Sequence, residues 1–387
     1  MKVPALALVA ACLWNSACQG SSIAPTIEAT PAGQRAGSQD SSRGEDISTS
    51  LAKLLEASSL PSLSVAIIED GHLVASGAAG IRKVGSPDLV TRADKYHIGS
   101  CTKSMTASLA AMLVESGQIT WETTIGDVFE DLSMSAGFRG VRLDELLTNR
   151  GGVSGDVDPL LWASLWASTG TPSEARLQLV EATITSEPVH QPGAEFEYSN
   201  AGFAIAGAML ERAAGIPYEQ LLTQRLFEPL GMTSAGFRAP ATTGLVDQPY
   251  GHSGPESELS PVQPEPGGDN PTAIAPAGAV HCSAIDLAKY TRFHLGLGPK
   301  LLTDESLARL HKPETDANYA MGWGVLARSW GDGDVLQHSG SNTMFYTVIW
   351  IAPERDFAAV AMTNAAGAQA QILCDQAIAE AVQAYLD

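Results

Sequence analysis

Segments with strand-like patterns lie at the two ends of this 387-residue chain, and segments with helical spacing lie between them. Near the N-terminus, SLSVAIIEDGHLVASGAAG (residues 62–80) predicts two strands joined at Asp70-Gly71, a pair that favours a hairpin turn. Near the C-terminus, MFYTVIWIAPERDFAAVAMTN (344–364) predicts two apolar strands around a turn. We therefore expect an α/β (α+β) fold in which helices flank an antiparallel sheet built from both ends. A mostly helical domain is inserted at about 100–270.

Composition and charge narrow the classes of function. With 44% hydrophobic and 17% charged residues the chain has the composition of a globular protein, and its formal net charge is −20. This charge repels phosphate backbones and anionic lipid surfaces, so no nucleic-acid partner is expected. The five cysteines show no metal-binding or disulfide spacing, and we expect those of the folded part to be small buried residues. We predict no metal site and no cofactor.

The N-terminus is predicted to be a signal peptide over residues 1–17. Lys2 precedes VPALALVAACLW, an apolar stretch too short to span a bilayer. The following NSACQG resembles a bacterial lipoprotein cleavage box with Cys18 as the lipidation candidate, although Asn15 fits that box poorly. The segment ending at Cys12 fits better but leaves a very short apolar core, and a simple secretory signal is the alternative.

The targeting signal sets the expected location and domain organisation. We expect an exported protein, periplasmic or extracellular, whose contact with a membrane is a lipid anchor at Cys18. Residues 18–45 are rich in Ser, Gly, Ala, Pro and Thr and predict a flexible tether, which leaves 46–387 as the folded domain. Residues 238–277 are dense in Pro, Gly and Ser and predict a long loop.

The first candidate for chemistry is Ser100-Cys101-Thr102-Lys103, at the start of a predicted helix that ends near Gly117. Residues three apart share a helix face, so the hydroxyl of Ser100 and the amine of Lys103 lie one turn apart. A lysine kept partly neutral by burial can take the proton of a serine nucleophile. The spacing alone is weak, because Ser50-Leu51-Ala52-Lys53 repeats it within a short terminal helix.

The second candidate is Tyr198-Ser199-Asn200. In an extended segment residues two apart point the same way, so the phenol and the amide can face one cleft. A tyrosine beside a lysine can relay protons, and the amide can position substrate. A surface turn that caps the following helix is the structural alternative, and both can hold together.

The third candidate is His338-Ser339-Gly340-Ser341, which strand-like segments flank. A glycine on a strand at the edge of a cleft lets substrate approach the backbone, and a following N–H can serve an oxyanion hole. His252-Ser253-Gly254 repeats the pattern within the Pro- and Gly-rich loop. We expect a functional role for His338 and a structural one for His252.

The order and flanks of these motifs resemble the serine β-lactamase-like hydrolases over about residues 46–385. This family includes class C β-lactamases, penicillin-binding D,D-peptidases, D-amino-acid peptidases and related carboxylesterases. YHIGSCTKSMTASLAAMLVESGQI, QPGAEFEYSNAGFAIAGAMLERAAG, PAGAVHCSAIDLAKY, YAMGWGV and LQHSGSNTMFYTVIWIAPERD carry the resemblance.

The resemblance implies a role for each candidate. Ser100 would be the acylated nucleophile, Lys103 its partner in proton removal, and Tyr198 the base for acylation or deacylation. Asn200 would bind substrate, residues 338–340 would form the third motif, and the N–H groups of Ser100 and Ser341 would form the oxyanion hole.

Two departures from the family pattern bear on the substrate. Class C β-lactamases have Lys-Thr-Gly where this chain has His-Ser-Gly, so a fixed cation for a β-lactam carboxylate is missing unless His338 is protonated or an arginine substitutes. Many D-peptidases of the family have a histidine there. Thr148-Asn149-Arg150-Gly151-Gly152 stands where the family often has a histidine before a small residue and Ser-Gly.

The expected function is a serine hydrolase that forms an acyl-enzyme from a small ester or amide, of carboxylesterase or D-amino-acid peptidase type. A β-lactamase or D,D-carboxypeptidase is the nearest alternative. A non-catalytic cell-wall or penicillin-binding lipoprotein is the alternative from another class. The expected partner is a small-molecule ester or amide or a D-amino-acid peptide.

Overall fold

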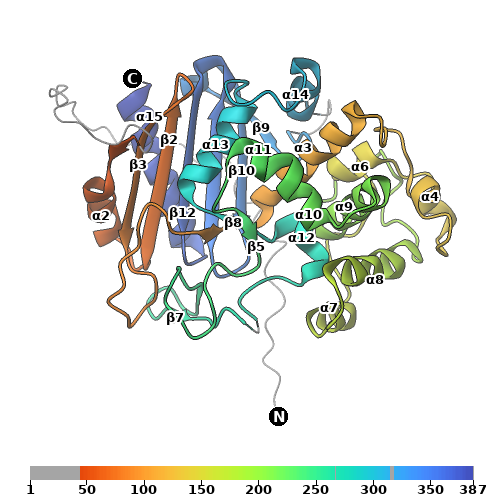
Figure 1. The fold of residues 1–387 in the computed structure, drawn as a ribbon, viewed down its shortest axis with the longest axis horizontal. Coiled ribbons are helices and arrows are strands. Elements are labelled where there is room, and N and C mark those ends of the chain that lie inside the picture. The colour runs from red at the N-terminus through yellow and green to blue at the C-terminus, as the bar shows by residue number, and fades with distance from the viewer. Residues whose placement is uncertain (1–43, 266, 314–317, 387) are drawn as a thin grey trace, which may run out of the picture.

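The computed structural model describes residues 44–265, 267–313 and 318–386, in which a seven-stranded sheet lies between two layers of helices (Figure 1). The strand order is β1-β3-β2-β12-β11-β10-β9. The strands are β1 Glu45–Asp46, β2 Ser62–Glu69, β3 His72–Gly80, β9 Gly324–Arg328, β10 Gly333–Ser341, β11 Tyr346–Ala352 and β12 Phe357–Thr363. The predicted signal peptide, Cys18 and residues 18–43 of the predicted tether lie outside the described residues.

The sheet joins the two chain ends, as the sequence predicts. β12 pairs antiparallel with β2, and both predicted hairpins form, β2 with β3 and β11 with β12. The predicted antiparallel sheet is confirmed for β2, β3 and β9–β12, and β1, which runs parallel to β3 at the edge, makes the sheet mixed. Glu45, assigned above to the tether, already lies in β1, since the chain enters the sheet beside β3 before it turns into the first helix.

Both faces of the central strands are covered, which explains their nearly continuous apolar sequence. Val65 and Ile67 of β2 face α2 (Ser48–Glu56) and α15 (Ala368–Tyr385), whereas Ala66 and Ile68 belong to the core shared with α13 (Ala284–His294). The described cysteines, at positions 101, 282 and 374, are free and buried in these cores, as predicted.

The region between the two halves of the sheet is mainly helical, as predicted. Its helices are α3 Thr102–Glu115, α4 Ile125–Val128, α5 Ala136–Arg139, α6 Leu143–Leu147, α7 Pro159–Trp166, α8 Pro172–Ile184, α9 Asn200–Ala214, α10 Tyr218–Leu222, α11 Glu228–Leu230 and α12 Ala275–Gly278. Gly215, in the left-handed conformation with φ +71°, ends α9 as its sequence indicates. None of the helices in the described residues is long and apolar enough to cross a membrane.

The predicted helix from residue 100 begins with a tighter turn. Gly99–Cys101 form a 3₁₀ turn, η1, that leads into α3. The strand before this turn, β4 (Tyr96–His97), belongs to a small sheet. Its strand order is β4, β8 (Val280–Cys282) and β5 (Gly236–Phe237). The predicted loop over 238–277 has only short elements in its described residues: β6 His252–Ser253, β7 Ser260–Pro261, η3 Thr272–Ile274 and the start of α12.

A chain of buried polar groups ties α3 to α13 and to α14 (Asp304–His311). The Tyr290 hydroxyl donates to Ser104 Oγ at 3.0 Å and lies 3.3 Å from Ser108 Oγ. Ser108 Oγ is 3.3 Å from His294 Nε2, and His294 Nδ1 is 2.8 Å from His311 Nε2. Burial lowers the pKa of His311 to about 4 and that of His294 well below its usual value. The two rings are therefore neutral in the folded protein at neutral pH.

These histidines predict a loss of stability in mild acid. A histidine in the unfolded chain takes up a proton near pH 6.5, whereas folded His311 does so only near pH 4. The stability that comes from keeping His311 neutral is therefore fully present above pH 6.5 and is lost as the pH falls towards 4. Urea titration at pH 7.5 and at pH 5 gives the drop in unfolding free energy between the two pH values. We expect this drop to be about 1 to 2 kcal/mol smaller in His311→Gln than in wild type.

His72→Gln is the matched control, because His72 is exposed at the start of β3. This variant should lose as much stability in acid as the wild type does. An equal loss in His311→Gln and wild type would contradict the prediction.

Candidate active site

The side chains of Ser100 and Lys103 meet at the junction of η1 and α3. Lys103 is fully buried, and its Nζ donates to Ser100 Oγ at 3.1 Å, to Asn200 Oδ1 at 2.7 Å and to the Ala277 carbonyl at 2.9 Å. Ser100 itself is partly exposed. The amine thus sits inside the protein while the hydroxyl beside it reaches the surface.

Burial gives the Lys103 amine an unusual pKa. It lowers the pKa to about 7, because the charged form is excluded from water. A large share of the amine is then neutral near pH 7 and can accept a proton from a neighbouring hydroxyl. Lys53, at the same spacing from Ser50, is exposed on α2, so the two Ser-x-x-Lys segments differ as the sequence indicates.

Tyr198 and Asn200 enter the same cluster from the start of α9. The Tyr198 side chain hydrogen-bonds Ser100, and Lys103 Nζ lies 4.7 Å from the centre of the Tyr198 ring. Burial raises the pKa of the phenol, so Tyr198 is neutral near pH 7 in the free protein. Ser199, between the two, caps α9 by accepting the Gly202 N–H at 3.0 Å. The capping and cleft-facing interpretations of this segment therefore hold together.

Asn149 is a residue of the site that the sequence did not identify. Its side-chain Oδ1 accepts the Ser199 N–H at 3.1 Å, and its carbonyl accepts the Glu197 N–H at 2.8 Å. These bonds hold the backbone on both sides of Tyr198. Asn149 has a φ of +57°, a conformation that asparagine tolerates better than most residues. The segment 148–152, which departs from the family pattern, thus holds the backbone around Tyr198 in place.

The third motif lies on β10, directly against η1. A Cβ added to Gly340 would lie 2.0 Å from the Ile98 carbonyl oxygen and 2.6 Å from the Ser100 amide nitrogen. One added to Gly99 would lie 2.2 Å from the Ser341 amide nitrogen. Only glycines permit this approach, which brings the amide groups of Ser100 and Ser341 to one junction.

His338 lies beside this junction but carries no charge. Its ring is buried, with Nε2 3.5 Å from the Tyr319 hydroxyl, and burial lowers its pKa to about 3, assisted by the nearby Lys103 charge. A protonated His338 therefore does not replace the missing cation near neutral pH. Tyr319, whose ring also packs against Phe196 and Tyr198, is a further member; it begins the YAMGWGV segment that carries the family resemblance, but the sequence indicated no role for it.

Ser339 is the predicted residue that the structure does not bring into the cluster. Successive strand residues point to opposite faces, so Ser339 faces away from His338 and hydrogen-bonds Tyr346, a residue of the core under α15. The Ser341 side chain accepts the Thr343 N–H at 2.9 Å and shapes the turn after β10.

His252, the second histidine of this pattern, has a structural environment. Its ring lies 2.8 Å from the Asn364 carbonyl through Nδ1 and accepts the Val84 N–H at 3.0 Å through Nε2. It therefore ties the long loop to the sheet, as expected.

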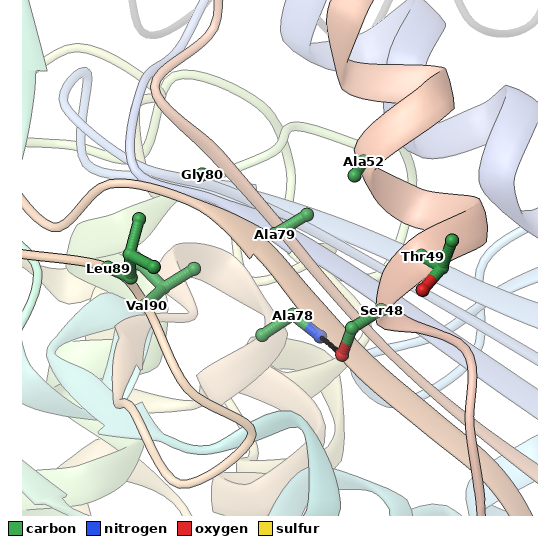
Figure 2. Close-up of a pocket in the computed structure, with 8 residues that line it drawn as sticks. All are labelled: Ser48, Thr49, Ala52, Ala78, Ala79, Gly80, Leu89 and Val90. Carbon is green, nitrogen blue, oxygen red and sulfur yellow. Dashed lines mark hydrogen bonds between the residues drawn. The ribbon is translucent and has the colours of Figure 1, made fainter.

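A separate hollow of about 310 Å³ lies between α2 and β3 (Figure 2). In Figure 2 the Ser48 hydroxyl accepts the Ala78 N–H, and the remaining lining is mostly small and apolar. The lining residues are Ser48, Thr49, Ala52, Ala78, Ala79, Gly80, Leu89 and Val90. None of them carries a carboxylate, imidazole, amine or thiol, so the candidate site stays at Ser100. In the described ranges, no three His, Cys, Asp or Glu side chains are grouped as metal ligands would be.

Known proteins share both the sequence pattern and the fold. The chain is similar to penicillin-binding protein 4 of Amycolatopsis lactamdurans, with 26% identity over 323 residues that cover 79% of this chain and 81% of that protein. The octameric penicillin-binding protein homologue from Pyrococcus abyssi matches with a TM-score of 0.72, at 24% identity, over 87% of this chain and 76% of that one.

A D-stereospecific amidohydrolase from Streptomyces sp. has the same fold, with a TM-score of 0.68 at 21% identity, over 85% of this chain and 96% of that one. The model of the Beta-lactamase family matches residues 47–383, nearly the whole of the described part. The mixed sheet with its helical insert is thus the β-lactamase/transpeptidase fold, and the chain belongs to the Beta-lactamase family of serine hydrolases.

Proposed function

We propose that this protein hydrolyses a small ester or amide through an acyl-Ser100 intermediate, as a carboxylesterase or D-amino-acid peptidase does. The observation that carries the proposal is the 3.1 Å contact between Ser100 Oγ and the buried Lys103 amine. A serine hydroxyl is a weak nucleophile until a base takes its proton, and a neutral amine at this distance can do so.

Acylation begins when neutral Lys103 accepts the Ser100 proton as Oγ attacks the substrate carbonyl carbon. The resulting oxyanion is stabilised by the amide N–H groups of Ser100 and Ser341, which lie at one junction. Tyr198, neutral and hydrogen-bonded to Ser100, donates a proton to the leaving alcohol or amine and is reprotonated through Lys103. The tetrahedral intermediate then collapses to the acyl-enzyme.

Deacylation reverses these roles with water as the nucleophile. The neutral Lys103 amine takes a proton from water, the hydroxide oxygen attacks the acyl carbon, and the Ser100 oxygen takes that proton back from Lys103 as it leaves. Asn200 Oδ1 holds Lys103 in place at 2.7 Å throughout, which leaves its amide nitrogen available to a substrate carbonyl. Both half-reactions use protein groups alone.

The third motif favours substrates without a free carboxylate. β-Lactams and the C-terminal D-alanyl peptides cleaved by D,D-carboxypeptidases carry a carboxylate beside the scissile bond. Here the position of the usual cation holds neutral His338, and nearby Arg150 is buried and donates to the Gly193 and Ala194 carbonyls. The likeness to a D-stereospecific amidohydrolase supports the same choice.

A non-catalytic binding lipoprotein is the weaker alternative. Such a protein has no need for a buried lysine with a pKa lowered to about 7 beside a serine that reaches the surface. Export, and a lipid anchor at Cys18, stay part of the proposal, because residues 1–43 lie outside the described structure. Cleavage and lipidation at Cys18 can be read from the mass of the mature N-terminus.

Removal of the nucleophile tests the proposed mechanism. We expect Ser100→Ala to lower turnover of a p-nitrophenyl short-chain ester roughly 10³-fold or more and to abolish labelling by a fluorophosphonate. Ser50→Ala, in the exposed Ser-x-x-Lys segment of α2, is the matched control and should behave as wild type. Unchanged turnover in Ser100→Ala would refute the mechanism.

The pKa of Lys103 predicts the acid limb of the pH profile. Below about pH 7 the amine is protonated and cannot accept the Ser100 proton, so kcat/KM should fall about tenfold per pH unit. Lys103→Arg stays charged at every accessible pH and should remain nearly inactive from pH 6 to 9. A wild-type profile that is flat from pH 5 to 8 would exclude Lys103 as the base.

A panel of substrates distinguishes the finer alternatives. We expect p-nitrophenyl esters or D-amino-acid p-nitroanilides to be cleaved with at least about tenfold higher kcat/KM than nitrocefin and D-alanyl-D-alanine peptides, since one unpaired carboxylate costs about 1.5 kcal/mol or more. Faster turnover of nitrocefin would favour the β-lactamase alternative.

A further inference from the structure

A buried histidine, His97, holds the turn that carries Ser100. It ends β4, two residues before Gly99, and its side chain is completely buried. Its Nδ1 accepts the Gly99 N–H at 3.0 Å, and its Nε2 lies 2.7 Å from Oδ1 of Asp269. One imidazole thus hydrogen-bonds the backbone of the turn through Nδ1 and lies at ion-pair distance from a carboxylate of a distant segment through Nε2, where the alignment is not that of a hydrogen bond.

Gly99 is held in the turn by close contacts and by hydrogen bonds on both of its peptide groups. Its φ of +49° is left-handed, and a Cβ here would strike Ser341. Its carbonyl accepts the Thr102 hydroxyl at 2.7 Å, and the Cys101 N–H binds the Ile98 carbonyl at 3.2 Å. His97 thus holds the peptide group before Gly99, and Thr102 holds the one after it, so the imidazole acts on the second group through the backbone of Gly99. The second of these groups contains the Ser100 N–H.

Asp269 comes from the long loop over 238–277. Gly268, just before it, packs so closely that a Cβ would lie 2.5 Å from the Gln263 carbonyl oxygen and 2.6 Å from that of Pro264, so the loop folds back on itself here. The next residue, Asn270, donates through Nδ2 to the Gly278 carbonyl at 2.7 Å. Gly278 in turn lies beside Gly99, since a Cβ there would be 3.3 Å from the Gly99 carbonyl carbon.

We propose that His97 and Asp269 form a positioning pair that fixes the Ser100 turn for catalysis. Accepting the Gly99 N–H requires an unprotonated Nδ1, and a carboxylate at Nε2 favours the tautomer with its proton on Nε2. The pair touches neither the substrate nor the reacting atoms and acts through the backbone. The inference rests on the proposed function of Ser100, and it gives the long loop a role in that site.

His97→Phe is the decisive variant, because phenylalanine keeps the ring packing beside Phe345, whose centroid lies 6.3 Å from the His97 ring, and removes the acceptor. We expect kcat for the p-nitrophenyl ester to fall about 30- to 100-fold while KM changes by no more than about twofold. The reason is that loss of a residue that holds the catalytic groups in place displaces these groups without removing a contact to the substrate. Asp269→Ala should lower kcat by nearly as much as His97→Phe does. Asp269→Asn and His97→Gln keep an oxygen acceptor and should recover part of the rate.

His252→Phe is the matched control. His252 is equally buried and also accepts a backbone N–H, from Val84 at 3.0 Å, but it lies outside the Ser100 turn. It should lose stability without loss of kcat. Equal kcat in wild type and His97→Phe, or an equal fall in His252→Phe, would overturn the proposal.

Hydrogen exchange separates failure of this inference from failure of the proposed function. Amide exchange over residues 97–104 should be at least about tenfold faster in His97→Phe than in wild type and unchanged in His252→Phe, whether or not any ester is cleaved. Unchanged exchange in His97→Phe would overturn the positioning role. A wild-type protein without Ser100-dependent turnover would instead refute the proposed function.

Discussion

The buried amine of Lys103 is the interaction on which the rest of the site depends. An ammonium group taken out of water without partners costs several kcal/mol, so the protein must either supply acceptors or release the proton. Here both occur: three oxygens lie within 3.1 Å of Nζ, and the pKa falls to about 7. The acceptors come from η1, α9 and α12, which are far apart in the chain. The amine therefore requires the helical insert and the sheet to assemble around it.

This assembly is possible because glycines surround the Ser100 turn. Gly99 and Gly340 let β10 touch the turn, and a Cβ on Gly322 would lie 2.5 Å from the Ser104 amide nitrogen of α3. Such backbone-to-backbone contacts leave the amide groups of Ser100 and Ser341 in fixed positions, and fixed dipoles need little reorganisation when charge develops. Side chains therefore supply the proton acceptors of the site, and bare backbone supplies its proposed anion-stabilising groups.

Much of this could be predicted from the sequence because the signals are local. The Asp70-Gly71 turn, the helical spacing after Ser100 and the Tyr-x-Asn segment each depend on residues a few positions apart. The roles of Asn149, Tyr319 and Asp269 could not be predicted, although the segments named from the sequence contain them, since each acts through contacts across the fold: with the Ser199 N–H, with the Tyr198 and His338 rings, and with His97. Ser339 lies outside the cluster for a related reason, because strand alternation places its side chain on the face opposite His338.

The burial that lowers the pKa of the Lys103 amine also keeps the neighbouring side chains uncharged. It raises the pKa of Tyr198 and lowers that of His338 to about 3, so near pH 7 both of these side chains are uncharged, and Lys103, with its pKa of about 7, is charged in only part of the molecules. In such surroundings an isolated charge is unfavourable, and a substrate carboxylate would lose its water without gaining a fixed cation. The oxyanion that forms during attack meets oriented N–H groups instead. The site therefore favours charge that appears during the reaction over charge that the substrate brings with it, which is the electrostatic basis of the proposed preference for a neutral ester or amide.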